Sequence, residues 1–246
     1  HPHPPPQSTT HTPKTNIPPS LHTLTNHLPP GQTLGILGHT GSGKTTIARL
    51  LLRFYDIQQG EICIGERATT QVPLTELRQR VGLVTQDVQL FQATIRDNLT
   101  FFDTFIQDED ILQTLDLLGL SDWLNALPAG LDTILSADSR GLSAGQAQLL
   151  AFARVFLKDP GLVILDEASS RLDPTTEELI ERAVDKLLEQ RTGIIIAHRL
   201  KTIQRADQIL ILEKGKVVEY GDRQTLIQTP CSRFAQLLKL GSITLR

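Results

Sequence analysis

Short apolar runs alternate with longer amphipathic stretches along this 246-residue chain. Runs that are typical of strands stand at 33–37, 60–66, 80–86, 162–167, 193–198 and 208–221. The last run carries the dipeptide Lys214-Gly215 near its centre, which predicts a hairpin. The runs "LVILD" and "GIIIA" are continuously apolar, as expected of parallel strands buried on both faces. The pattern therefore predicts an α/β core.

Helical patterns fill the spaces between these runs. From about Ile95 to Asp159 the chain is mostly helical in pattern, with breaks at 118–124, 127–133 and 136–141. A second long helix is expected after Asp173, which can cap it, with Pro174 in the first turn. The sequence thus predicts a helical insertion, at about 87–160, within the α/β core.

The first thirty residues have a different composition. They hold nine of the fourteen prolines and five of the seven histidines. Proline is excluded from central strands, so we expect 1–20 to form an extended or disordered arm and 21–246 to form the folded domain.

Bulk properties exclude several classes of protein. The net charge is −3 and there is no basic run, which argues against a nucleic-acid partner. No apolar run approaches the roughly eighteen residues that a membrane span needs. Cys63 and Cys231 lack metal-binding spacing and are expected to be free thiols. The chain contains no Met, so we interpret it as part of a longer protein.

A glycine-rich stretch, "GHTGSGKT", follows the first strand and opens a helix. It matches the P-loop pattern, in which backbone N–H groups surround phosphates, the lysine reaches the β- and γ-phosphates and the hydroxyl holds Mg²⁺. Lys44 and Thr45 take those two roles here. The predicted ATP-binding residues are Gly38, His39, Thr40, Gly41, Ser42, Gly43, Lys44, Thr45 and Thr46.

Further polar residues stand at the ends of other strands. "LVILDE" delivers Asp166 to a carboxyl end, where it is expected to approach the same Mg²⁺ as Thr45. Glu167 follows and can orient or deprotonate an attacking water. His198 ends "GIIIAH" and is expected near the γ-phosphate. Gln86 ends another strand and can contact Mg²⁺ or the water.

The stretch "LSAGQ" places small residues at the start of the long helix before Asp159. Small residues leave backbone N–H groups uncovered, and a helix N-terminus with bare N–H groups favours an anion.

Together these motifs resemble the nucleotide-binding domain of ATP-binding cassette (ABC) proteins of the exporter type. In the family's order they are Walker A, the Q-loop at Gln86, the signature "LSAGQ", Walker B, the D-loop "SSRLD" and the switch His198. The resemblance implies a P-loop NTPase core with a mostly parallel sheet, an N-terminal antiparallel β portion and an inserted helical subdomain. It implies Mg-dependent ATP hydrolysis in which Lys44, Gln86, Glu167 and His198 act, with Thr45, Gln86 and Asp166 around the metal.

The resemblance also implies partners. Two such domains, alike or unlike, pack head to tail, and the signature and D-loop of one meet the ATP of the other. The residues concerned are Leu142, Ser143, Ala144, Gly145, Gln146 and Asp173. A transmembrane domain, associated or fused, is expected to contact Gln86–Asn98 and to place the chain at the cytoplasmic face of a membrane, where ATP drives export.

Several positions depart from the family pattern. Ala144 stands where Gly is usual, Ala147 replaces a basic residue after the signature, and Ala137 takes the place of a Glu. Relatives stack an aromatic ring on adenine near the N-terminus, and His11 aligns with that ring.

Two other functions stay open at this point. One is a soluble ABC ATPase of DNA repair or translation, although this chain has neither a coiled-coil insertion nor a second cassette. The other is a regulatory half that binds ATP in a heterodimer without turning it over, against which the retained Glu167 argues.

Overall fold

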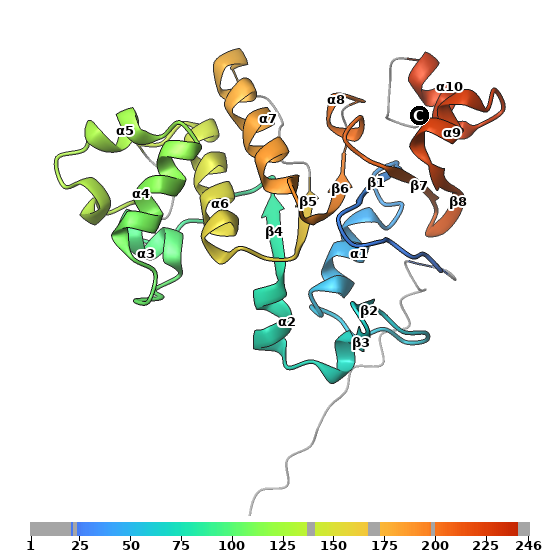
Figure 1. The fold of residues 1–246 in the computed structure, drawn as a ribbon, viewed down its shortest axis with the longest axis horizontal. Coiled ribbons are helices and arrows are strands. Elements are labelled where there is room, and N and C mark those ends of the chain that lie inside the picture. Colours follow the sequence, from blue (N-terminus) through green and yellow to red (C-terminus); the bar gives the residue numbers. More distant parts are fainter. Residues whose placement is uncertain (1–20, 22–23, 137–140, 167–172, 198–199, 241–246) are drawn as a thin grey trace, which may run out of the picture.

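The computed structural model describes residues 21, 24–136, 141–166, 173–197 and 200–240. Within these ranges six strands form the central sheet, in the order β4-β5-β6-β1-β7-β8 (Figure 1). In chain order they are β1 (Thr33–Gly38), β4 (Val81–Thr85), β5 (Leu162–Asp166), β6 (Thr192–Ile196), β7 (Gln208–Glu213) and β8 (Lys216–Asp222). The first five of these are mutually parallel where they pair, which confirms the α/β prediction.

Antiparallel pairing occurs in two places. β8 pairs with β7 through a two-residue turn in which Lys214 and Gly215 have φ values of 50° and 76°. Positive φ at both turn residues matches the right-handed twist of a hairpin, so the predicted hairpin is confirmed. A separate small sheet joins β2 (Cys63–Ile64) to β3 (Arg67–Ala68). It supplies the antiparallel portion in the first part of the chain.

Helices cover both faces of the central sheet. Alternate side chains of one strand point to opposite faces, so Leu34 and Ile36 pack with Ala48 while Leu37 joins the core on the other side. On the first face lie α1 (Lys44–Leu51) and α2 (Leu74–Arg80), and the 3₁₀ turn η1 (Thr69–Gln71) precedes α2. The second face packs against α6 (Ala144–Lys158), α7 (Pro174–Leu188), α8 (Leu200–Ile203) and α10 (Arg233–Lys239). The short α9 (Arg223–Gln228) follows β8.

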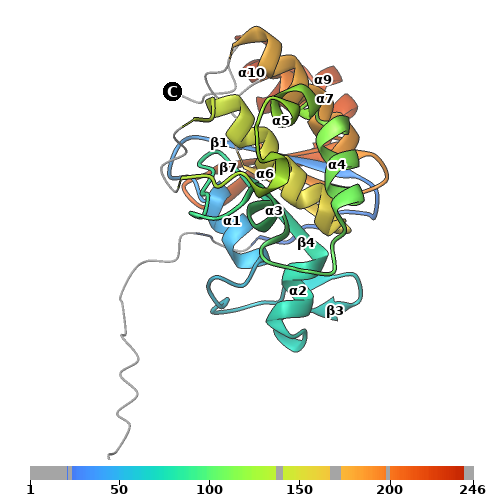
Figure 2. The same ribbon diagram turned by 90° about the vertical axis from the view of Figure 1, so that its left-hand side faces the viewer.

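A group of helices lies between β4 and β5 in the chain. They are α3 (Ile95–Thr100), α4 (Asp108–Leu117), α5 (Ser121–Asn125), the 3₁₀ turn η2 (Gly130–Asp132) and α6. Figure 1 shows α3, α4 and α5 beside α6, on the opposite side of the molecule from β8 and α9, and Figure 2 views the molecule from that side. Helices therefore stand where the sequence predicted them. The bounds of a separate subdomain at 87 and 160 stay a prediction, and the predicted arm 1–20 lies outside the described residues.

The start of α7 and the end of α6 are set by capping residues and prolines. Asp173 caps α7 by accepting a hydrogen bond from the Thr176 N–H at 3.0 Å, and Pro174 occupies the first turn, as predicted. α6 ends at Lys158, its C-cap Asp159 has a left-handed φ of 47°, and Pro160 follows. A proline at that place cannot continue the helix.

An ion-pair group on the helical side ties α3 to its neighbours. The Arg96 guanidinium donates from Nε to Asp108 at 2.7 Å and from a terminal nitrogen at 2.8 Å, and it also pairs with Asp132. The hydrogen bonds from Arg96 hold the pKa of Asp108 below its usual value. Because the folded pKa is depressed, this contribution to stability is present above the unfolded pKa and is lost as pH falls through the folded value.

We therefore expect Asp108→Asn to lower the free energy of unfolding by about 1 kcal/mol or less at pH 7, since the pair is half-exposed. The difference from the wild type should shrink below about pH 4, near the unfolded pKa of an aspartate. Urea unfolding at pH 7 and pH 3 measures it, with Asp110→Asn on the same first turn as the control. A difference that grows on acidification contradicts the assignment.

Candidate functional site

The P-loop follows β1 directly. β1 ends at Gly38 on the carboxyl edge of the sheet, and α1 begins at Lys44. Gly41 and Gly43 have φ values of 81° and 109°, a backbone region that residues other than glycine rarely adopt. No side chain caps α1, so the N–H groups of its first turn have no partner within the helix. The Ser42 N–H donates to the His39 carbonyl within the turn, and the uncapped start of α1 lies at the carboxyl edge of the sheet.

Gly38 is required by a close approach. A Cβ there would lie 2.4 Å from the Leu212 carbonyl oxygen and 2.5 Å from Ser42 Oγ. Both distances are far inside van der Waals contact. The Ser42 hydroxyl is itself buried and makes no hydrogen bond among the described residues. A buried hydroxyl without a partner costs free energy, and a phosphate oxygen is a suitable acceptor for it.

Lys44 carries a positive charge into the inside of this loop. Its side chain is only 5% exposed, and its ammonium donates to the carbonyl oxygens of Gly38 at 2.8 Å and His39 at 3.0 Å. The loop therefore closes around its own lysine. This geometry fits a polyanionic phosphate chain, because the ammonium already lies at the inner side of the turn.

The other strand ends gather at the same edge. Asp166 lies opposite Thr85 on one side and Ile196 on the other, and Ile36 of β1 is also in register with Ile196. Gln86 directly follows Thr85 and is exposed. α1 packs against β1 and β5, which brings Thr45 to the side of the sheet that carries Asp166. The structure thus collects the predicted residues of three separate segments.

Three predicted residues lie outside the described residues: His11, Glu167 and His198. The residues just before the last two are described. Asp166 ends β5, and Ala197 follows β6 as a buried residue at the same edge.

The signature stretch forms the first turn of α6. Ser143 Oγ accepts a hydrogen bond from the Gln146 N–H at 3.1 Å, and the Gln146 side chain accepts one from the Ser143 N–H at 2.9 Å. This reciprocal pair is a capping box. The Ala147 N–H donates to the Ser143 carbonyl, so Ala144 and Gly145 carry the first-turn N–H groups that the box leaves over. Leu142 packs against the core, whereas Ser143 and Ala144 are exposed.

The capping box was missed from the sequence, although its signal was present. Ser143 and Gln146 have the S-x-x-Q spacing that predicts it. The consequence is that the Ser143 hydroxyl oxygen already accepts one bond, while its proton remains available to an anion.

A second missed group ties the signature helix to the Q-loop segment. Gln148 of α6 donates to the Thr85 carbonyl at 3.2 Å, one residue before Gln86. Arg154 donates to the carbonyls of Gln89 at 2.8 Å and Asn98 at 2.7 Å. Burial lowers the pKa of Arg154 from its usual value, and an arginine still remains charged under such a shift. α6 and the segment 86–98 are therefore fixed to one another.

Asn98 braces the same segment from within. It is 1% exposed, its amide donates to the carbonyls of Phe91 at 2.9 Å and Thr94 at 3.0 Å, and its oxygen accepts from the Phe91 N–H at 2.8 Å. These bonds fold 91–94 into a compact turn ahead of α3. No periodic pattern in the sequence signals such a side chain, because it acts on the backbone of a loop.

Exposed aromatic side chains lie beside this turn. Phe91, Phe101 and Phe102, here called the aromatic patch, are 45%, 56% and 57% exposed. The ring of Phe91 lies 6.0 Å from that of Phe101 and 5.8 Å from that of Phe102. Arg154 lies 4.8 Å above the Phe101 ring. Clustered exposed rings of this kind mark a contact surface.

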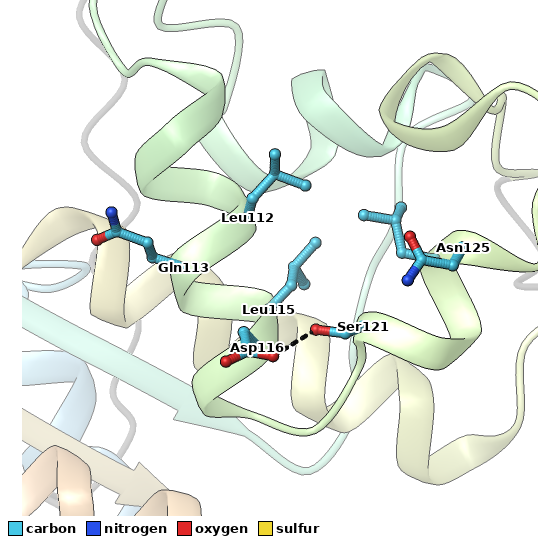
Figure 3. A pocket seen from close by; sticks show the side chains of 7 residues that line it. Leu112, Gln113, Leu115, Asp116, Ser121 and Asn125 are labelled. Atoms are coloured by element: carbon cyan, nitrogen blue, oxygen red, sulfur yellow. Dashed lines mark hydrogen bonds between the residues drawn. The ribbon is translucent and has the colours of Figure 1, made fainter.

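The helical side also carries a shallow pocket of about 360 Å³ between α4 and α5. Figure 3 shows the side chains of Leu112, Leu115 and Asn125 around it, with a hydrogen bond from Ser121 to Asp116 at 2.8 Å. None of the predicted site residues lines it. The phosphate-binding chemistry and this pocket are therefore separate.

Neither a metal cage nor a membrane span is found in the described parts of the chain. No group of three or more His, Cys, Asp and Glu side chains there could hold a metal ion. Among the same residues, no helix is both long and apolar enough to cross a bilayer.

Known proteins are similar to this chain in both sequence and fold. Residues 21–170 match the family model described as ABC transporter. The chain is 40% identical over 222 residues to an ATP-dependent lipid A-core flippase of Pectobacterium atrosepticum, covering 90% of this chain and 38% of the flippase. It is 38% identical over 214 residues to ABC transporter B family member 21 of Arabidopsis thaliana, covering 87% of this chain and 16% of that protein.

A solved structure has the same fold. The ATP-bound structure of a bacterial Atm1-family ABC exporter superimposes with a TM-score of 0.81 and 35% identity, covering 90% of this chain and 38% of the exporter chain. The chain thus spans about two fifths or less of the length of these relatives. The P-loop geometry, the sheet order and these similarities agree: the chain belongs to the ABC transporter family.

Proposed function

We propose that this chain binds and hydrolyses Mg-ATP as one half of a head-to-tail dimer and thereby powers export by a transmembrane domain. The observation that carries the proposal is the carboxyl edge of the sheet, where the P-loop with its buried Lys44 shares one edge with Asp166 and Gln86. Phosphoryl transfer to water is catalysed mainly by positioning and charge stabilisation, which such an edge provides.

Each residue at this edge has a proposed role. Lys44 and the other P-loop residues of 38–46 bind the phosphates, and Thr45, Asp166 and Gln86 hold the metal. When bound, Mg²⁺ neutralises charge on the β- and γ-phosphates. A metal with so few protein ligands fits Mg²⁺, which keeps waters and substrate phosphates in its coordination shell. Glu167 orients and deprotonates the water, His198 contacts the γ-phosphate, and His11 lies against adenine.

The second domain is proposed to complete each site. The Ser143 hydroxyl donates a hydrogen bond to the γ-phosphate of ATP on the partner, and the N–H groups of Ala144 and Gly145 point at the same anion. Asp173 and the remaining signature residues Leu142 and Gln146 shape the contact. The exposure of Ser143 and Ala144 supports this arrangement, because both must be accessible to another chain.

The transmembrane domain is proposed to dock on Gln86–Asn98 and the adjoining rings. The aromatic patch supports this proposal, since its three rings are exposed and the segment below them is braced by Asn98. The chain then works at the cytoplasmic face of a membrane. The relatives named as a flippase and an exporter favour this role over that of a soluble ATPase. A regulatory half that binds ATP in a heterodimer remains the second candidate.

Ser143→Ala tests the trans arrangement. We expect its ATPase rate to fall by about 100-fold, as when one preorganised donor is lost, while the affinity of the monomer for ATP stays near that of the wild type. The lost cap also costs about 1 kcal/mol of stability. Steady-state hydrolysis and titration with a fluorescent ATP analogue measure the two effects.

Ser143→Thr is the matched control, because threonine retains a hydroxyl that caps the helix and donates a proton. It should keep most of the activity. If Ser143→Ala instead abolishes ATP binding by the monomer, Ser143 belongs to the site of its own chain and the trans arrangement is wrong.

A further inference from the structure

Gly145 of the signature turn faces its own chain. Ser143 and Ala144 are exposed, whereas Gly145 is buried. A Cβ on Gly145 would lie 2.0 Å from Thr176 Cγ2, 3.0 Å from its Cβ and 3.1 Å from its Oγ1. No side chain fits at the first of these distances. The backbone of α6 thus lies directly on the side chain of Thr176 in α7.

Thr176 also contacts the D-loop residue. Its backbone N–H donates to Asp173 Oδ1 at 3.0 Å. Thr176 therefore contacts Asp173 through its backbone and Gly145 through its methyl group. One residue bridges the two segments that are proposed to meet the partner's ATP.

A second close contact lies on the same face of α7. A Cβ on Gly119 would lie 2.8 Å from Leu179 Cδ2. Residues three apart share one helix face. Thr176 and Leu179 therefore lie on one face of α7, where Thr176 packs against Gly145 and Leu179 against Gly119.

We infer that Thr176 is a positioning residue that fixes the signature turn relative to Asp173, and that position 145 requires glycine because of the Thr176 methyl in the same chain. The alternative is that the partner's phosphate demands the glycine. The inference rests on the proposed function for its effect on ATP turnover, whereas the packing contact can be tested without it.

The test uses the 246-residue chain with Gly145→Ala alone and combined with changes at Thr176. Thr176→Ser removes the methyl and keeps the hydroxyl, while Thr176→Val keeps the methyl bulk and loses the hydroxyl. Thr175→Ser, on the exposed neighbour, is the control. Each protein is assayed for its melting temperature and for kcat at saturating Mg-ATP.

Gly145→Ala should lower the melting temperature by about 3–10 °C, as expected of overpacking in a domain of this size. Its kcat should fall by about 100-fold, because a misplacement near 1 Å has effects of that order. Adding Thr176→Ser should restore most of both quantities, and adding Thr176→Val or Thr175→Ser should restore neither.

The outcomes separate the possibilities. If Thr176→Ser restores the melting temperature of Gly145→Ala but not its kcat, the nucleotide demands the glycine and Thr176 is merely structural. If Thr176→Val rescues as well as Thr176→Ser, the methyl is not the obstacle and the inference is wrong. If the wild type itself shows no turnover, the proposed function fails, while the melting temperatures still decide whether the contact exists.

Discussion

Lys44→Ala is expected to lose nearly all ATP turnover, by about 100- to 1,000-fold, as when one charged group that stabilises a transition state is removed. The structure gives the reason. The Lys44 ammonium is buried in the turn and held by the carbonyls of Gly38 and His39 at 2.8 and 3.0 Å. No other described lysine lies within this loop. A phosphate chain that enters the turn meets this charge first, so ATP binding should weaken together with hydrolysis.

The measurement pairs a fluorescent-nucleotide titration with steady-state hydrolysis. Lys216→Ala removes an exposed lysine from β8 and should leave both quantities unchanged. Lys44→Arg separates charge from shape, since a guanidinium keeps the charge without the compact ammonium. A Lys44→Ala protein that hydrolyses ATP at the wild-type rate contradicts the P-loop assignment.

Glu167→Gln is expected to slow hydrolysis by about 100- to 10,000-fold, the usual contribution of a general base. ATP binding should persist, because Glu167 follows Asp166 at the strand end and is not among the proposed phosphate-binding residues. ATP then accumulates at the site, and binding that is not followed by hydrolysis should hold two chains together. Light scattering should therefore report a monomer without nucleotide and a dimer with Mg-ATP.

Glu178→Gln, on the exposed face of α7, is the control and should hydrolyse ATP normally. Unchanged hydrolysis in Glu167→Gln contradicts its assignment as the base. A Glu167→Gln protein that binds ATP and stays monomeric contradicts self-pairing and directs the search to an unlike partner half.

Much of the fold was predictable because its signals are local. The apolar runs at 162–166 and 193–196 became β5 and β6, paired in parallel, and Asp173 with Pro174 started α7 as expected. The P-loop followed its pattern for the same reason, since its glycines act within a few residues of one another. Each of these features depends on neighbours in the chain.

The missed features depend on contacts that are remote in sequence. Arg154 reaches the carbonyls of Gln89 and Asn98, more than fifty residues earlier. Gly145 was interpreted as a residue that bares an N–H group, and its burial against Thr176 became visible only when α6 and α7 were packed. Helical periodicity predicts which face of α6 is apolar, but it cannot say which residue of α7 that face meets.

The hydrogen bonds of Arg154 attach one end of α6 to the segment 86–98, and the signature turn lies at the other end of the same helix. Ser143 caps the 15-residue helix, and Arg154 lies near the other end, 4.8 Å from the centre of the Phe101 ring. The eleven residue steps from Ser143 to Arg154 span about 16 Å at the helical rise. A tilt of about 5° imposed at the ring would displace the serine hydroxyl by about 1.4 Å over that length, more than a hydrogen bond tolerates. Under the proposed trans arrangement, a small tilt of α6 at the aromatic patch would therefore change the contact between the signature turn and a partner's phosphate.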